Sequence, residues 1–128
     1  VMDKWFALQA TSSLPGTLDT VAALLGHAAF SIRNPNRVRA LIGAFCTANQ
    51  LRFHAADGSG YRFLADQVLT LDPINPQVAA RLLGPLGPWR RFDAARGALM
   101  KTQLERILNN GRALSADVYE ITSKSLST

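Results

Sequence analysis

The sequence is poor in cysteine and histidine, and it has no long hydrophobic run. Its single cysteine, Cys46, cannot form an internal disulfide or build a structural metal site by itself, which agrees with a reducing compartment. Charge, glycine or proline interrupts every candidate helix, so the sequence predicts neither a membrane-spanning segment nor a cleavable signal segment. We therefore expect a cytoplasmic protein without membrane contact.

Leucine and alanine are the abundant residue types. The 128 residues are 48% apolar, with 18 Leu and 19 Ala but only 11 Val and Ile together. Strong helix formers thus outnumber β-branched residues, and the chain is too apolar to be disordered. The composition predicts one all-α domain over residues 1–128. A domain of this length buries roughly two thirds of its unfolded surface, which is enough for independent folding.

Helical periodicity predicts about seven helices joined by short turns. We expect them at 3–12, from 17 to Gly26, from 35 onward, from 61 to the Asp72-Pro73 stop, from 76 to Gly84-Pro85, from 92 to the Asn110-Gly111 stop, and from 116 onward. The apolar positions expected to face the core are Trp5, Leu8, Leu18, Val21, Ala22, Leu25, Val38, Leu41, Ile42, Phe45, Tyr61, Leu64, Val68, Leu71, Val78, Ala79, Leu82, Leu83, Leu99, Met100, Leu104, Ile107, Leu108, Val118 and Ile121. The aromatic residues Phe6, Phe53 and Phe63 are also expected to pack in the core.

The helix beginning at Pro35 has the clearest start signal. Asn34 is expected to cap it, Pro35 fits the first turn, and apolar residues follow at helical spacing. Asp3 is the expected cap of the first helix, and Ser115 with Asp117 opens the last. The stretch from Gly84 to Trp89 holds two prolines and two glycines, so no long regular element is expected there.

An internal repeat links two of these helix starts. A displacement of 41 positions places Asn34 on Asn75 and Pro35 on Pro76, and it also aligns the apolar residues that follow. This period is typical of armadillo and HEAT repeats, so we predict an α-α superhelix with one concave face. Arg39 and Arg81 fall near corresponding turns of the two repeats and could share a face.

The charge is positive and unevenly distributed. Fourteen basic residues, eleven of them arginine, against nine acidic ones give a net charge of +5. No acidic residue occurs between Asp19 and Asp57, where four arginines lie. This stretch is either a solvated basic surface or a site for an anion, such as nucleic acid, a carboxylate-bearing peptide or an acidic protein face. Arginine favours fixed bidentate contacts with carboxylate or phosphate.

Arg33 and Arg37 are possible anion-binding residues. They flank the start of the helix at Pro35, where the helix dipole is positive and disfavours a cation by a few tenths of a kcal/mol. Such a placement needs a counter-anion. An internal carboxylate, such as Asp57 or Asp66, is one candidate, and a ligand carboxylate or a partner protein is the other.

Catalytic and metal-binding patterns are missing, so we assign no catalytic and no metal-binding residue. The two histidines, His27 and His54, are far apart in sequence, and packing or capping explains them better than a zinc site completed by Cys46. The segment Asp57–Gly60 contains glycines but no Gly-Lys-Ser/Thr ending, so it predicts a turn rather than a phosphate loop. A small enzyme using His54 with Asp57 stays a minor alternative, because nothing completes its catalytic set.

Several motifs resemble one known family across nearly the whole chain. They run from Asp3-Lys4-Trp5-Phe6 through Asn34-Pro35-Asn36-Arg37-x-Arg39, Phe53-His54-Ala55-x-Asp57-Gly58-Ser59-Gly60-Tyr61 and Asn75-Pro76-Gln77-Val78-Ala79-x-Arg81 to Asp117-Val118-Tyr119-Glu120. In this order they resemble the C-terminal domain of the bacterial aminopeptidase N family of zinc-dependent gluzincin aminopeptidases. The stretch Gly84–Trp89 departs from that family in being richer in glycine and proline.

The resemblance implies that the chain is the C-terminal helical domain of a longer enzyme. That enzyme removes N-terminal residues from peptides and holds its zinc in a catalytic domain whose motifs are not in this sequence. The helical domain would close over the catalytic cleft and line the chamber that peptides enter, without activity of its own. Arg39 and Arg81 match the arginines that line the chamber, where they would attract the peptide's C-terminal carboxylate or hydrogen-bond its carbonyls.

The implied partners are the catalytic domain of the same polypeptide and peptide substrates, with no nucleic acid. One side of the isolated chain should then expose an apolar patch and favour self-association. The alternative that the residues leave open is an independent helical-repeat module, whose face of Arg33, Arg37, Arg39 and Arg81 binds an acidic protein or nucleic acid.

Overall fold

The computed structural model describes residues 2–109 and 114–127. Every regular element in these two ranges is helical, which confirms the predicted all-α class. The chain forms two compact units, 1–55 and 56–128, each with its own core. No helix within the described ranges is long and apolar enough to cross a membrane.

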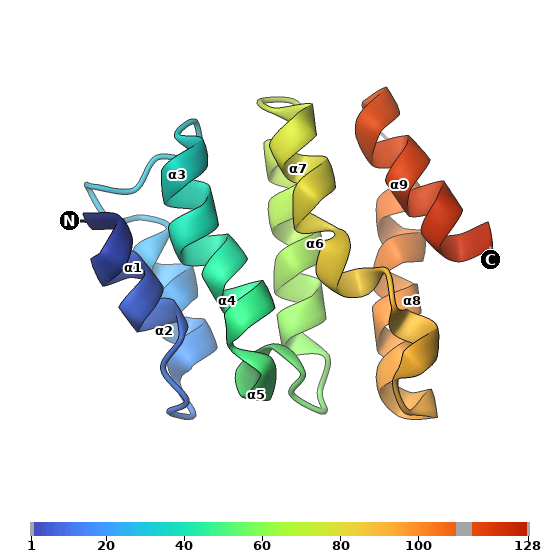
Figure 1. The fold of residues 1–128 in the computed structure, drawn as a ribbon, viewed down its shortest axis with the longest axis horizontal. Helices are drawn as coiled ribbons and strands as arrows, with labels where there is room; N and C mark the ends of the chain where they lie inside the picture. Colours follow the sequence, from blue (N-terminus) through green and yellow to red (C-terminus); the bar gives the residue numbers. More distant parts are fainter. Residues whose placement is uncertain (1, 110–113, 128) are drawn as a thin grey trace. The chain divides into compact units, whose positions relative to one another are not determined.

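The first unit is built from helices and helical turns that follow one another closely (Figure 1). Its elements are α1 (Met2–Ala10), α2 (Thr17–Leu24), α3 (Pro35–Val38), the π-helical turn η1 (Arg39–Gly43), α4 (Ala44–Ala48) and α5 (Gln50–Phe53). Helix α1 packs against η1 and α2. No prediction covered α5, which begins where the Asn49 side chain accepts a hydrogen bond from the Arg52 amide.

The start of α3 confirms the predicted cap. The Asn34 side-chain oxygen accepts from the amides of Asn36 and Arg37 at 3.0 and 3.4 Å, and Pro35 occupies the first turn. The predicted apolar face is fully buried; it consists of Val38, Leu41, Ile42 and Phe45. The helical path continues through η1 into α4, and a π-helical turn inside such a path often marks a functional position.

The predicted inner face of α1 is wrong. Trp5 is 37% exposed and Leu8 is 68% exposed, whereas Phe6 and Ala10 are fully buried. Both pairs are apolar and helically spaced, so periodicity could not distinguish them. The buried Phe6 ring makes edge-to-face contacts with the rings of His27 and Phe30, which lie in a later segment of the chain. Asp3 also lies inside the first turn of α1 rather than before it, so it is not the helix cap.

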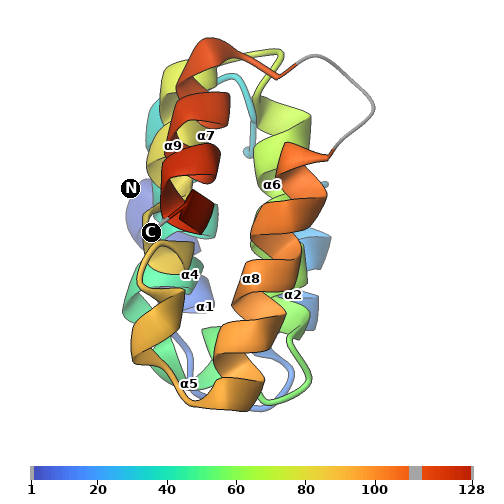
Figure 2. The ribbon, with the colours of Figure 1, turned by 90° about the vertical axis from the view of Figure 1, so that its right-hand side faces the viewer.

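The described residues of the second unit form α-helices joined in part by two short 3₁₀ turns. Its elements are α6 (Ser59–Leu71), α7 (Pro76–Leu82), η2 (Gly84–Leu86), η3 (Trp89–Arg91), α8 (Ala94–Leu108) and α9 (Ala116–Ser127). Helix α6 packs against α7 and α8, and α9 packs against the same two helices, as Figure 2 shows from one side. The two 3₁₀ turns confirm that no long element occupies Gly84–Trp89, and the predicted stop at Asn110-Gly111 lies outside the described residues.

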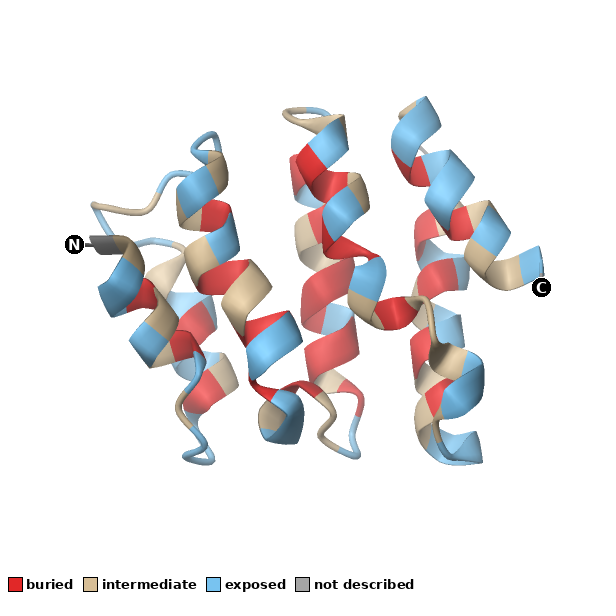
Figure 3. Ribbon diagram, in the orientation of Figure 1, coloured by how far each residue is buried: buried red, intermediate tan, exposed pale blue. Residues whose placement is uncertain are grey.

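Most predicted core positions of this unit are buried (Figure 3). They are Tyr61, Leu64, Val68, Leu71, Val78, Ala79, Leu82, Leu83, Met100, Leu104, Ile107 and Val118. Leu99 and Leu108 are half-buried. Ile121 was predicted wrongly: it is 41% exposed, and the neighbouring Thr122 is buried instead. Thr122 lies about one helical turn after the buried Val118, so the two residues share the surface of α9 that packs on α7 and α8.

The repeated helix start is the same structure twice. Asn75 caps α7 as Asn34 caps α3, accepting from the Val78 amide at 3.3 Å, and Pro76 occupies the first turn. The turn before α6 follows the prediction as well. Gly58 has a φ of 75°, which suits glycine, and the Asp57 carboxylate accepts from the Ser59 amide at 2.9 Å.

Candidate peptide-facing arginines and a cavity on α8

Arg39 opens the π-helical turn of the first unit, and its side chain is exposed. One guanidinium nitrogen donates to the side-chain oxygen of Asn36 at 2.6 Å, which holds the arginine against the turn before it. No carboxylate within the described ranges pairs with Arg39. Its remaining donors are therefore available to an external acceptor.

Arg81 lies in the last turn of α7 in the second unit, and it is exposed too. A cation at this end of a helix is favoured by the dipole, so its position costs no stability. Its guanidinium has no hydrogen-bonding or carboxylate partner among the described residues. Arg39 and Arg81 belong to different units, and their common face stays a prediction.

Arg37 has an internal counter-anion. Its Nη1 donates to Asp3 Oδ1 at 2.6 Å, and its Nε donates to the carbonyl of Ala29 at 3.0 Å. The partner is thus neither Asp57 nor Asp66, the two carboxylates suggested by the sequence. The pair joins the start of α1 to the start of α3, and it offsets the unfavourable position of a cation near a helix N-terminus.

Arg33 differs from Arg37 in its surroundings. The backbone amide of Arg33 donates to the hydroxyl of Ser31 at 3.3 Å, but its exposed guanidinium has no partner among the described residues. Arg33 is therefore the member of this pair with donors left for an external anion. The Asp66 carboxylate is already engaged by Arg106 of α8.

The other chemically interesting side chains are in structural roles. Cys46 is buried, and desolvation raises the pKa of its thiol well above the ordinary value, so the thiolate is suppressed. The His27 Nδ1 accepts from the Ala29 amide at 2.9 Å, and the ring of His27 packs on Trp5 and Phe6. Hydrogen bonds from the Ser59 hydroxyl and amide hold the pKa of Asp57 below its usual value, which makes it a weak base.

No group of three histidine, cysteine, aspartate or glutamate side chains within residues 2–109 and 114–127 is arranged to hold a metal ion. The zinc implied by the family resemblance therefore does not fit the described residues of this chain. We assign it no ligand here.

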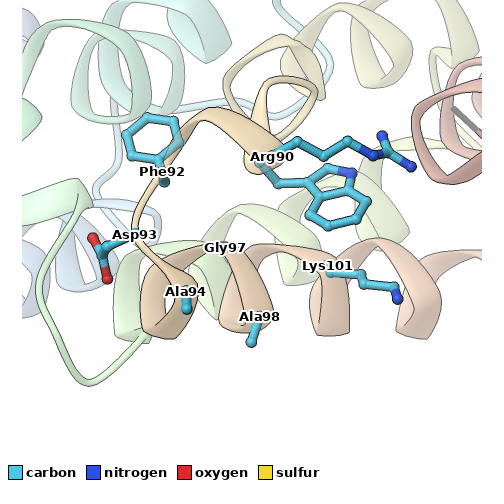
Figure 4. A pocket seen from close by; sticks show the side chains of 8 residues that line it. Arg90, Phe92, Asp93, Ala94, Gly97, Ala98 and Lys101 are labelled. Atoms are coloured by element: carbon cyan, nitrogen blue, oxygen red, sulfur yellow. The ribbon is translucent and has the colours of Figure 1, made fainter.

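A cavity of about 350 Å³ lies beside α8 in the second unit (Figure 4). Sequence reasoning missed it. The indole of Trp89 contributes to its wall, together with the small residues Ala94, Gly97 and Ala98 on α8. Lys101 lies at one end and Asp93 at the other. Residues 94, 97, 98 and 101 share one helical face, but their spacing does not show that the turn η3 passes close to it.

Comparison with known proteins places the chain in a family. Residues 1–127 match the family described as a domain of unknown function, DUF3458_C, with ARM (armadillo) repeats. This match confirms the predicted armadillo-type helical architecture. The chain is also 38% identical to Legionella pneumophila aminopeptidase A, whose crystal structure in complex with aspartic acid superposes with a TM-score of 0.91 over 98% of this chain and 14% of that one.

Curated relatives give the same assignment. The chain is 51% identical over 126 residues to aminopeptidase N of Escherichia coli and 49% identical over 126 residues to that of Caulobacter vibrioides. In both cases the match covers 98% of this chain and only 14% of the relative. The chain belongs to the DUF3458_C family of armadillo-repeat domains and is similar to the C-terminal region of bacterial aminopeptidase N.

Proposed function

We propose that this chain is the C-terminal helical domain of a zinc-dependent aminopeptidase, here called the parent enzyme, which removes N-terminal amino acids from peptides. In this proposal the domain caps the catalytic cleft and lines the chamber through which peptides enter. The zinc and the hydrolytic residues belong to the catalytic domain of the same polypeptide. The observation that carries the proposal is the match of 98% of this chain to 14% of each aminopeptidase N relative.

The exposed apolar residues of the first unit support docking on the rest of the parent enzyme. Leu8, Leu14 and Leu51 are 68%, 70% and 61% exposed. Leu14 lies in the loop between α1 and α2, directly after Ser13. Arg52 Nε donates to the carbonyl of Ser13 at 2.8 Å, so this loop lies close to α5, the helix of Leu51. Large apolar side chains this exposed are typical of a surface that another part of the polypeptide covers.

The arginines support a role in substrate binding. Beyond the bond from Arg39 to Asn36, Arg39 and Arg81 keep guanidinium donors that have no acceptor among the described residues. A guanidinium binds a carboxylate through two parallel hydrogen bonds. We assign to them the attraction of the peptide's C-terminal carboxylate inside the chamber. Arg33 is a further anion-binding candidate, whereas Arg37 contributes less because Asp3 neutralises it.

Arginine variants of the full parent enzyme test this assignment. We expect Arg39→Ala and Arg81→Ala each to raise KM about fivefold for peptides with a free C-terminal carboxylate, equivalent to ~1 kcal/mol, and to leave kcat unchanged. Peptides with an amidated C-terminus should show a smaller effect. Arg91→Ala removes an exposed arginine of the second unit and is the matched control. Equal changes in the control, or none in either variant, would contradict the assignment.

The independent binding module makes a different prediction. Its affinity for nucleic acid would fall steeply as salt rises, because phosphate contacts release counterions. Tight binding of oligonucleotides at low salt, without association with the catalytic portion of the parent enzyme, would favour the independent binding module over the aminopeptidase domain.

A further inference from the structure

The cavity beside α8 exists because the residues facing the turn η3 are small. A Cβ atom on Gly97 would lie 2.8 Å from the carbonyl oxygen of Trp89, so only glycine lets the turn approach α8 so closely. Ala94 and Ala98 lie one turn apart on the same side of α8 (Figure 4). Short side chains at both positions leave an apolar floor to the cavity, whose lining also includes Trp89.

Two of the three charged residues that line the cavity already have partners. Arg90 donates to the carbonyls of Ser125 and Leu126 at 2.9 and 3.1 Å, at the negative end of the α9 dipole. Asp93 pairs with Arg96 at 3.2 Å. Arg90 and Asp93 therefore already have partners within the second unit.

Lys101 is the charge that lacks an anion. Its ammonium lies 5.4 Å from the centre of the Trp89 ring, and no carboxylate of the described residues pairs with it. The Arg90 guanidinium lies closer to the same ring, 4.0 Å from its centre, so the indole attracts both cations. A carboxylate attached to an apolar group would match this arrangement, with its charge at Lys101 and its apolar part against Trp89 and Ala98.

We propose that this cavity is a second peptide site, separate from the one assigned to Arg39 and Arg81, and that it binds the C-terminal residues of a peptide with the terminal carboxylate on Lys101 and the last side chain against Trp89. The distance along α8 from Asp93 to Lys101 is about 12 Å at 1.5 Å per residue, which three extended residues span. The carboxylate of Asp93 then faces the backbone amides of the third residue from the end. The inference rests on the proposed function only in taking peptides as the molecules that the parent enzyme encounters.

The charge pattern disfavours two other ligands. A free amino acid would bring its ammonium group next to its carboxylate, close to Lys101 and Arg90, where like charges repel. A ligand with two anionic ends would place its second charge at Asp93. A peptide avoids both, because its amino group lies several residues away.

Trp89 is itself the probe for the test. The chain has two tryptophans, so Trp5→Phe leaves Trp89 as the source of indole fluorescence. The probe ligand is the acetylated tripeptide Ala-Ala-Leu with a free carboxylate, compared with its C-terminal amide and with free leucine. We expect a saturable change in Trp89 emission with the acid, and binding at least tenfold weaker with the amide or with leucine.

Two variants locate the site. Lys101→Met should weaken binding of the acid about tenfold and abolish the difference between acid and amide. Lys4→Met removes an exposed lysine of the first unit and should change nothing. Ala98→Leu fills the floor of the cavity from an exposed helix position and should abolish binding while circular dichroism stays unchanged.

The outcomes are decisive in both directions. Equal binding of acid and amide, equal effects of Lys101→Met and Lys4→Met, or no saturable change in a folded chain would overturn the proposal. The measurement uses no catalytic portion, so it can fail while the aminopeptidase assignment holds. Conversely, peptide binding here would persist even if the chain did not assemble with a catalytic domain.

Discussion

Asn49→Ala should be among the more destabilising single changes in the first unit. The Asn49 side chain is only 4% exposed, and its Nδ2 donates to the carbonyls of Ala10 and Ser12, both at 2.8 Å. Its oxygen also accepts from the Arg52 amide at 3.2 Å and begins α5. One side chain therefore joins the end of α1 to the start of α5.

The expected loss follows from these three hydrogen bonds. Removal of an N-cap costs about 1 kcal/mol, and each buried amide–carbonyl bond contributes about 1 kcal/mol, so Asn49→Ala should cost about 3 kcal/mol. This corresponds to a fall in Tm of roughly 10 °C for a chain of this size. Chemical denaturation followed by circular dichroism measures it, with Asn109→Ala, an exposed asparagine after α8, as the control. A loss below about 1 kcal/mol would refute the reasoning.

Three further changes test other parts of the structure. Gly97→Ala should destabilise the second unit by about 1 kcal/mol or more despite the better helix propensity of alanine, because the new Cβ would lie 2.8 Å from the Trp89 carbonyl oxygen. The control is Gly84→Ala, whose Cβ would meet no atom within 4 Å, and equal stabilities of the two variants would contradict the packing argument. Cys46 should resist thiol reagents at pH 8 until the chain unfolds, since burial raises the pKa of its thiol; rapid labelling of the folded chain would count against this. The pKa of Asp57 is lowered in the folded state, so its contribution to stability is present above about pH 4 and is lost as pH falls through the folded pKa. Asp57→Asn should therefore flatten the decline in Tm below about pH 4. An unchanged dependence of Tm on pH in this variant would exclude a stabilising role of the Asp57 carboxylate.

Local signals in the sequence predicted most of the helices. The Asn-Pro starts at 34–35 and 75–76 and the glycine turn at Gly58 are recognisable because the backbone conformation there depends on the residue itself. The buried positions of α3 to α4, α6 and α7 were also predicted from the spacing of their apolar residues, since each has a single apolar stripe.

Features set by contacts between distant residues could not be predicted in this way. The burial of Phe6 on α1 depends on ring contacts with His27 and Phe30, which lie in a later segment of the chain. The partner of Arg37 is Asp3, which is separated from it by 34 positions. The cavity beside α8 depends on a close approach of backbone segments at Gly97, and no pattern of residue types shows how near two segments pass.

In the proposed function, the chain supports and gates the catalytic domain of an aminopeptidase. The most direct test is the zinc-dependent peptidase activity of the catalytic portion of the parent enzyme, expressed without residues 1–128 and measured before and after this chain is added in trans. The account predicts that the chain is inactive alone, binds the catalytic portion, and restores cleavage or restricts it to short peptides. Hydrolysis by the isolated chain, or addition without binding and without any change in activity, would contradict it.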